Sequence, residues 1–210
     1  MKKIIVTGID TNIGKTVASA IICRALAADY WKPIQCGELD NSDTIKVKRL
    51  LGRNSAMMHP EAYALKHPLS PHAAAELEGV EISLDEIHLP PAENTLVIEG
   101  AGGPMVPLNL RETLLDLISA LDADIILISK NYLGSINHTL LCLEVFKQRG
   151  LTVSGILISG DENRASELAI SSISGIPVIG HIEWAEVMGP EFVTDQADKL
   201  RPELQKHLGL

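Results

Sequence analysis

The sequence predicts a single α/β domain built on a doubly wound, mainly parallel sheet with helices on both faces. Short apolar runs alternate with helical patterns along almost the whole chain, which is the order that parallel βαβ units require. The chain has 210 residues, so one domain over residues 1–210 is the default expectation. Hydrophobic residues make up 46% and aromatic residues only 3%, and such an aliphatic core suits a sheet that is buried on both sides.

Strands are expected where short apolar or β-branched runs lie between turn residues or helical patterns. They cover residues 3–7, 31–35, 95–99, 124–129, 153–159 and 177–182. Apolar residues at helical spacing predict the helices between and after these strands. They cover residues 15–28, 42–51, 72–77, 112–121, 137–149, 162–174 and 195–208. The rest of the stretch from 54 to 91 is expected to be loop.

Composition and charge argue against several classes of function. The formal net charge is −9 and no basic stripe is present, so nucleic-acid binding is not expected. No apolar run reaches about 18 residues, and the first residues lead straight into a strand, so neither a membrane span nor a signal peptide is expected. Cys23, Cys36 and Cys142 form no CxxC pair, which argues against disulfides and zinc. These features predict a cytoplasmic protein.

A variant phosphate-binding loop follows the first strand. Residues 8–16 read GIDTNIGKT and lead directly into a helix. In such a loop Gly14 lets the backbone approach phosphates, Lys15 reaches the outer phosphates and the Thr16 hydroxyl can bind Mg²⁺. Five residues, rather than the usual four, separate Gly8 from Gly14, and the alternative is a glycine-rich turn that merely starts a helix. The strand before, the helix after and the final Lys-Thr favour a P-loop NTPase-like nucleotide site.

Two carboxylates are candidate partners for Mg²⁺, which prefers oxygen ligands and needs only one or two of them from the protein. Glu99 closes the strand TLVIE, and an acid directly after buried residues is costly unless it is paired, which favours a metal role over a turn cap. Asp43 stands at a helix start, where capping and metal binding explain it equally well. Lys32 precedes Pro33 in a short strand, and on pattern alone it is a solvated edge residue.

Two polar motifs have local explanations. Ser70 before Pro71 fits a helix cap with proline at the first helical position, so His72 alone does not indicate catalysis. Asn137 and His138 open a helix, where capping is again the simpler account.

Taken together, these motifs resemble the dethiobiotin synthetase family. The loop of residues 8–17 has that family's extra residue between its glycines, and the similarity continues in order from residue 3 to about residue 184. The further matching motifs are Lys32-Pro33 with Cys36-Gly37, Asn41-Ser42-Asp43, Ser70-Pro71-His72, Glu99-Gly100-Ala101-Gly102-Gly103 and Leu133-Gly134-Ser135-Ile136-Asn137-His138.

The resemblance implies a homodimeric, Mg²⁺-dependent cyclo-ligase of biotin biosynthesis. Its substrates are 7,8-diaminononanoate, CO₂ or bicarbonate, and a nucleoside triphosphate, usually ATP; its products are dethiobiotin, ADP and phosphate. In that chemistry one amine forms a carbamate with CO₂, and the carbamate oxygen attacks the γ-phosphate. The second amine then attacks the carbamic–phosphoric anhydride, which closes the ureido ring.

The resemblance also implies a role for each matched residue. Lys32 stabilises negative charge between the carbamate and the γ-phosphate. The loop from Leu133 to Asn137, with Tyr132 next to it, binds the substrate carboxylate from the other subunit through backbone N–H groups at a helix start. The implied catalytic residues are Lys32, Lys15 and Thr11. The implied Mg²⁺ ligands are Thr16, Asp43 and Glu99. The implied nucleotide contacts are Asn12, Ile13, Gly14, Lys15, Thr16, Val17, Asp43, Glu99, Gly100, Ala101, Gly102, Ser159, Gly160, Glu183 and Trp184. The implied substrate contacts are Cys36, Ser70, Gly102, Leu133, Gly134 and Asn137.

A few positions depart from the family pattern. Asn12 replaces a glutamate, Cys36 replaces a serine, and Glu183 replaces a proline. Ser159 and Gly160 stand where the family has an Asn-Asp pair that reads adenine. Serine lacks the two-sided amide that can pair with a base edge, so weak discrimination among nucleobases is expected.

Two other functions use this style of loop. A nucleotide-switched partitioning ATPase of the MinD type carries a signature lysine early in the loop, where this chain has Ile9 and Asp10. An amide-forming synthetase of the cobyrinate type carries a glutaminase domain, for which 210 residues leave no room.

Overall fold

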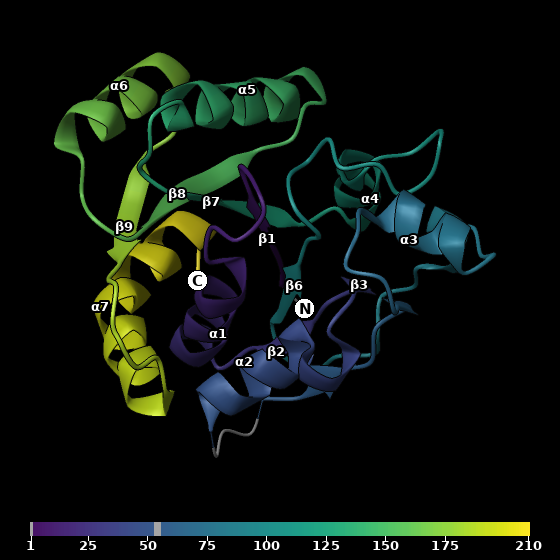
Figure 1. Ribbon diagram of the computed structural model, residues 1–210. Coiled ribbons are helices and arrows are strands. Elements are labelled where there is room, and N and C mark those ends of the chain that lie inside the picture. The colour runs from purple at the N-terminus through teal and green to yellow at the C-terminus, as the bar shows by residue number, and fades with distance from the viewer. Residues whose placement is uncertain (1, 53–55) are drawn as a thin grey trace.

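A seven-stranded parallel sheet forms the centre of the computed structural model, which describes residues 2–52 and 56–210 (Figure 1). The strand order is β4-β2-β6-β1-β7-β8-β9, with parallel pairing throughout. These strands are β1 (Lys3–Gly8), β2 (Asp29–Trp31), β4 (Met58–His59), β6 (Leu96–Glu99), β7 (Asp124–Ser129), β8 (Val153–Ser159) and β9 (Val178–Ile182). The predicted doubly wound parallel class is confirmed.

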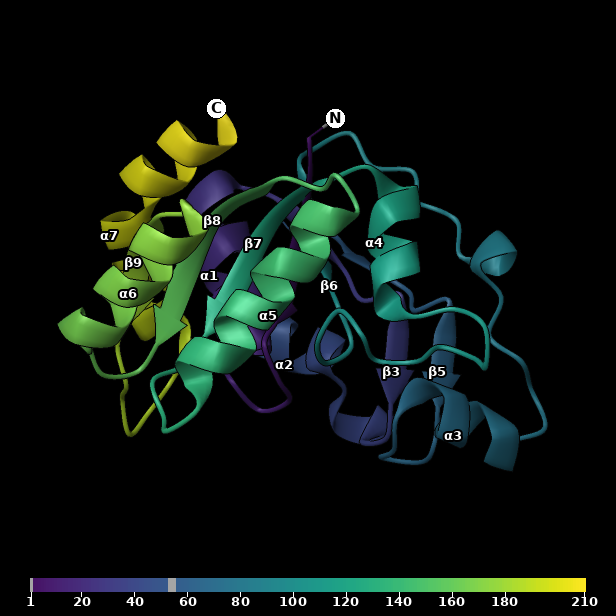
Figure 2. The same ribbon diagram turned by 90° about the horizontal axis from the view of Figure 1, so that it is seen from above.

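Helices cover both faces of the sheet because its strands bury apolar side chains on both sides (Figure 2). One face carries α1 (Lys15–Leu26), α2 (Asp43–Leu51) and α7 (Pro190–Leu208). The other carries α4 (Leu114–Leu121), α5 (Ser135–Gln148) and α6 (Arg164–Ser174). Short 3-10 turns cover Leu39–Asn41 and Leu84–Glu86. Within residues 2–52 and 56–210, none of the helices combines the length and the apolar character needed to cross a membrane.

The predicted strand at 31–35 is wrong, because the chain forms two short strands on either side of Pro33. β2 stays in the main sheet, whereas β3 (Ile34–Cys36) pairs in parallel with β5 (Tyr63–Leu65) in a separate two-stranded sheet. Pro33 has no N–H with which to continue a ladder, and its carbonyl accepts hydrogen bonds from the backbone that leads into β5. This small sheet and α3 (Pro71–Leu77) stand beside the main sheet (Figure 2).

Other differences concern short elements and helix starts. β4 and β5 lie in the stretch predicted as loop, since strands of two or three residues are too short to show an alternating pattern. The helix expected from 137 begins at Ser135, and the one expected from 195 begins at Pro190, where a proline suits the first helical position. Residues 53–55 of the predicted loop lie outside the described residues.

Candidate functional site

A cavity of about 610 Å³ opens at the carboxyl ends of β1 and β6, between the loop after β1 and the region of β3 and α3. Ligands bind at this edge of open parallel sheets. Most of the residues singled out in the sequence meet here. The cavity is lined by Thr11, Asn12, Gly14, Lys15, Thr16, Val17, Lys32, Cys36, Asp43, Ser70, Glu99, Ala101 and Gly102, among others.

The loop after β1 has the backbone shape that phosphate binding requires. Gly14 has a φ of 98°, a left-handed conformation that strains any residue with a Cβ. A Cβ at this position would also lie 2.6 Å from Ser159 Oγ. α1 begins at Lys15, so the N–H groups of its first turn point into the loop. Lys15 Nζ donates to the Asp10 carbonyl at 2.7 Å, and burial lowers the pKa of Lys15 to about 8 although the nearby Glu99 opposes the shift.

Lys32 lies buried between two carboxylates. Its Nζ is 2.7 Å from Asp43 Oδ2 and 3.2 Å from Glu99 Oε1. Burial alone would lower the pKa of Lys32, but Glu99 and then Asp43 outweigh it and raise that pKa above its usual value. Burial likewise opposes ionisation of Asp43, yet Lys32 holds the pKa of Asp43 below its usual value. Lys32 is 5% exposed, so the interpretation as a solvated edge residue is wrong: the main sheet ends just before it.

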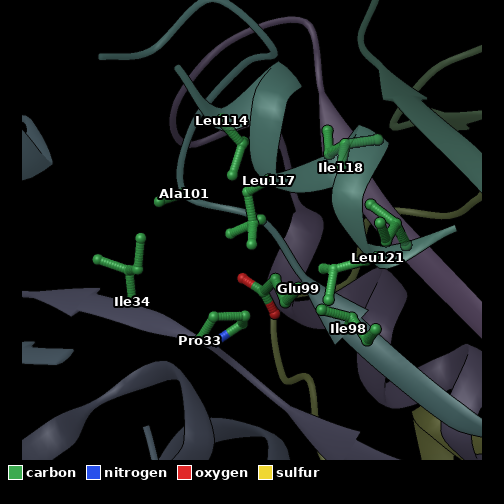
Figure 3. A pocket seen from close by; sticks show the side chains of 11 residues that line it. Pro33, Ile34, Ile98, Glu99, Ala101, Leu114, Leu117, Ile118 and Leu121 are labelled. Atoms are coloured by element: carbon green, nitrogen blue, oxygen red, sulfur yellow. The ribbon is translucent and has the colours of Figure 1, made fainter. Parts of the chain in front are cut away.

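Glu99 is only 1% exposed, and both oxygens of its carboxylate accept hydrogen bonds. Oε1 accepts from Thr16 Oγ1 at 2.9 Å and from Lys32 Nζ, and Oε2 accepts from the Tyr30 hydroxyl at 2.9 Å. Its other flank is apolar: Figure 3 shows Glu99 beside Pro33 and the leucines of α4. The gap that these residues line has a volume of about 10 Å³. So small and apolar a gap does not suit a ligand. The cost of burying the Glu99 carboxylate is therefore offset by its hydrogen bonds to Thr16, Lys32 and Tyr30, away from the apolar gap.

The first turn of α2 distinguishes the two roles considered for Asp43. Ser42 Oγ accepts from the Ile45 N–H at 3.3 Å, so Ser42 is the N-cap and Asp43 is the first helical residue. The Asp43 carboxylate instead contacts Lys32 and, at 3.4 Å, Lys46. The capping interpretation of Asp43 is wrong, and its charge faces the cavity.

Thr16, Asp43 and Glu99 form a donor set that fits Mg²⁺. They supply one hydroxyl and two carboxylates, all oxygen, on one cavity beside the phosphate loop. Within the described parts of the chain, no three His, Cys, Asp or Glu side chains converge on a metal position. Mg²⁺ is typically held by one or two carboxylates together with substrate phosphates and waters.

The predicted nucleotide contacts in the outer strands lie apart from this cavity. Ser159 ends β8 and Gly160 follows it, and Glu183 and Trp184 follow β9 at the same edge of the sheet. Ser159 adjoins the phosphate loop through Gly14. Glu183 accepts from Lys199 Nζ at 2.7 Å and from Gln196 Nε2 at 3.1 Å, and the Trp184 side chain is largely exposed. Two further predicted contacts are internal: Ile13 is buried in the core, and the Gly100 N–H donates to the Val6 carbonyl.

The loop before α5 is also outside the cavity of its own chain. Leu133 and Gly134 are exposed, and Gly134 is the left-handed N-cap of α5. Asn137 borders a different groove, of about 580 Å³, along α5. Tyr132 Oη and His138 Nδ1 are 2.7 Å apart across the helix start.

Several residues at the site were not predicted from the sequence. Gln35, Glu38 and Lys46 line the cavity, and Tyr30 contacts Glu99 from behind it. Tyr30 is fully buried in β2, and a tyrosine inside a strand is normally a core residue. Its closeness to Glu99 depends on β2 lying next to β6, where Tyr30 is opposite Val97. Strand neighbours of this kind are not visible in a local pattern.

Comparisons with known proteins point to one family. A family model described as an AAA domain matches residues 2–191. The ATP-dependent dethiobiotin synthetase BioD of Christiangramia forsetii is 49% identical over 203 residues, covering 97% of this chain and 98% of that protein. The protein of the same name from Cytophaga hutchinsonii is 49% identical over 201 residues, covering 95% and 97%.

Solved structures with the same architecture are more distant. The MinC:MinD complex of Aquifex aeolicus matches with a TM-score of 0.60 at 12% identity, covering all of this chain and 96% of that one. A putative plasmid partition protein of Borrelia burgdorferi bound to AMPPNP gives 0.61 at 12% identity, covering 98% of each chain. At such identities these likenesses show a P-loop NTPase-like fold alone. The near-full-length identity to synthetases is what decides the family: the chain belongs to the dethiobiotin synthetases.

Proposed function

We propose that this chain closes the ureido ring of dethiobiotin from 7,8-diaminononanoate and CO₂, using ATP and Mg²⁺ and releasing ADP and phosphate. The observation that carries the proposal is the placement of the Lys32 ammonium, 2.7 Å from Asp43 and beside the phosphate loop. A fixed positive charge is needed where a carbamate meets a γ-phosphate, because phosphoryl transfer depends mainly on positioning and charge neutralisation. Family membership supports the same reaction.

The residues around the cavity divide the work of the first step. The backbone at Gly14 and the start of α1 bind the outer phosphates, and Lys15 neutralises part of their charge. Thr16, Asp43 and Glu99 would hold Mg²⁺, which offsets the charge that develops on the phosphates during transfer. These groups align the γ-phosphate with the part of the cavity that Cys36 and Ser70 border.

Lys32 acts on the reacting atoms themselves. Its ammonium attracts both the carbamate and the γ-phosphate and so offsets their mutual repulsion while the carbamate oxygen attacks phosphorus and ADP leaves. The second amine then attacks the carbonyl carbon of the mixed anhydride, and phosphate departs with the bonding pair. Gly102 and Thr11 border the same space, where small groups leave room for the diamine.

The far end of the substrate is proposed to bind at a homodimer interface. Leu133, Gly134 and Asn137 are exposed at the start of α5, where backbone N–H groups suit a carboxylate. Because this loop lies outside the cavity of its own chain, it would serve the cavity of the partner.

The nucleobase is proposed to lie against the outer strands, near Ser159, Gly160, Glu183 and Trp184. The Ser159 hydroxyl offers a single donor and the Glu183 carboxylate is held by Lys199, so few groups remain to read a base edge. ATP is the proposed co-substrate, with weak preference over other nucleoside triphosphates.

Phosphate release by the purified chain tests the proposal. The reaction contains Mg²⁺ and bicarbonate, with or without 7,8-diaminononanoate, and ATP, GTP or CTP in turn. Diamine-dependent release together with a dethiobiotin mass peak is expected, with little difference among the three rates because Ser159 lacks the two-sided amide that reads a base edge. Nucleoside triphosphate hydrolysis at the same rate with and without the diamine would instead favour a nucleotide-switched ATPase and contradict the proposed synthetase activity.

A further inference from the structure

The Tyr30 hydroxyl contacts the site from behind the cavity. Tyr30 is 0% exposed, and its hydroxyl donates to Glu99 Oε2 at 2.9 Å. β2 pairs with β6 so that Tyr30 stands opposite Val97, two positions before Glu99 along the neighbouring strand. The contact therefore connects the rigid centre of the sheet to a carboxylate at the end of a strand.

The two oxygens of Glu99 face different surroundings. Oε1 accepts from Thr16 and Lys32, which both line the cavity. Oε2 accepts from Tyr30, which is sealed in the core. A carboxylate held on one oxygen only can rotate about its last torsion, whereas a hydrogen bond from the tyrosine to the other oxygen fixes the plane of the carboxylate.

The chemistry of the donor suits this role. A phenol is a neutral donor, so it holds the carboxylate without cancelling the charge that a cation needs. Lys32 and Lys46 already bring positive charge to this cluster, and a third cation on Oε2 would compete with a metal. Hydrogen-bonded partners behind metal-binding carboxylates typically change metal affinity or activity by about 10–100-fold when removed.

We propose that Tyr30 is a positioning residue that orients the Glu99 carboxylate toward Mg²⁺. This inference rests on the metal role given to Glu99 in the proposed function. The inference can be distinguished from a purely structural role, in which Tyr30 only provides a hydrogen bond to a buried carboxylate. Loss of a purely structural contact would change the stability of the protein and leave its metal affinity unchanged.

The test compares Tyr30→Phe with Tyr63→Phe. Both remove only a phenol oxygen, but Tyr63 Oη accepts from the Ser83 N–H at 3.1 Å, outside the cavity lining. Mn²⁺ binding is measured by electron paramagnetic resonance in the presence of a non-hydrolysable ATP analogue, and the Mg²⁺ dependence of turnover is measured separately. We expect Tyr30→Phe to weaken Mn²⁺ binding about tenfold or more and to raise the half-saturating Mg²⁺ concentration, while Tyr63→Phe matches the unaltered chain.

A double-mutant comparison keeps the outcome decisive. In the Glu99→Gln variant, the side chain that Tyr30 contacts is no longer a charged metal ligand. The double variant Tyr30→Phe/Glu99→Gln should therefore bind Mn²⁺ as well as Glu99→Gln alone does. Unchanged Mn²⁺ affinity in Tyr30→Phe, or an equal loss in both backgrounds, overturns the inference. The Mn²⁺ measurement needs no diamine. If turnover did not depend on the diamine, the proposed reaction would be contradicted, but the effect of Tyr30→Phe on Mn²⁺ affinity could still be measured.

Discussion

Two lysine–carboxylate pairs of equal length lie in contrasting parts of the molecule. Lys32 and Asp43 are 2.7 Å apart beside the phosphate loop, and Lys199 and Glu183 are 2.7 Å apart beyond β9. The side chains of the first pair are 6% and 20% exposed, and those of the second are 57% and 60% exposed. Distance is therefore the same, while access to water differs. The contrast teaches that burial, not geometry, decides how much each pair matters.

The neighbours of the two pairs extend the contrast. The inner lysine also contacts Glu99, which is held in turn by Thr16 and Tyr30, so each group is fixed by several others. The outer carboxylate has a second partner, the buried Gln196 of α7, but Glu183 and Lys199 themselves are largely exposed to water. The proposed function accordingly assigns the reacting atoms to the cluster around Lys32 and the nucleobase to the water-exposed region around Glu183.

The largest expected effect comes from Lys32→Met, which leaves two carboxylates beside the cavity without their shared cation. Removing one partner of a buried pair typically costs about 3–5 kcal/mol of unfolding free energy. Loss of a charge that stabilises the transition state typically lowers kcat by about 10²–10³-fold. Urea unfolding followed by circular dichroism and diamine-dependent phosphate release measure the two effects. Near-normal turnover in folded Lys32→Met protein would contradict the role given to Lys32.

Lys15→Ala is expected to affect the same region differently. Lys15 contacts the Asp10 carbonyl within its own loop, so its loss leaves the carboxylates paired with Lys32. Turnover should fall by about 10²-fold or more, and triphosphate binding should weaken as well, because a phosphate ligand is removed. Calorimetric titration with a non-hydrolysable ATP analogue separates the variants: Lys32→Met should retain binding that Lys15→Ala loses. Equal binding by both would erase the distinction between the two lysines.

Much of the region around Lys32 and the phosphate loop is predictable from the sequence, because short local motifs indicate it. The glycine-rich loop between a strand and a helix, and an acid at the end of an apolar strand, each require a specific environment. Gly14, Lys15 and Glu99 accordingly line one cavity. Pro33 is also a local signal, since proline cannot continue a strand ladder. The separate small sheet, however, depends on β5, whose residues lie 29 positions further along the chain than their partners in β3.

The contacts that were not predictable depend on which strands are neighbours. Tyr30 looks like a core tyrosine until β2 is placed beside β6, and Lys32 looks solvated until β2 is seen to end before it. Whether Leu133 and Asn137 serve a partner subunit is likewise undetermined by a local pattern, since the start of α5 is an ordinary helix start within one chain. Tertiary neighbours, rather than residue type, carry this information.

The smallest expected effect comes from Lys199→Met, the same substitution in a pair of the same length. Water already screens both side chains, and exposed pairs contribute little to stability. The urea midpoint should match that of the unaltered chain, in contrast to the loss expected for Lys32→Met in the same assay. If Lys199→Met and Lys32→Met instead lost comparable stability, the 2.7 Å contact itself would determine how much each pair contributes to the free energy of unfolding. Burial would then not explain why the pair of Lys32 and Asp43 differs from the pair of Lys199 and Glu183.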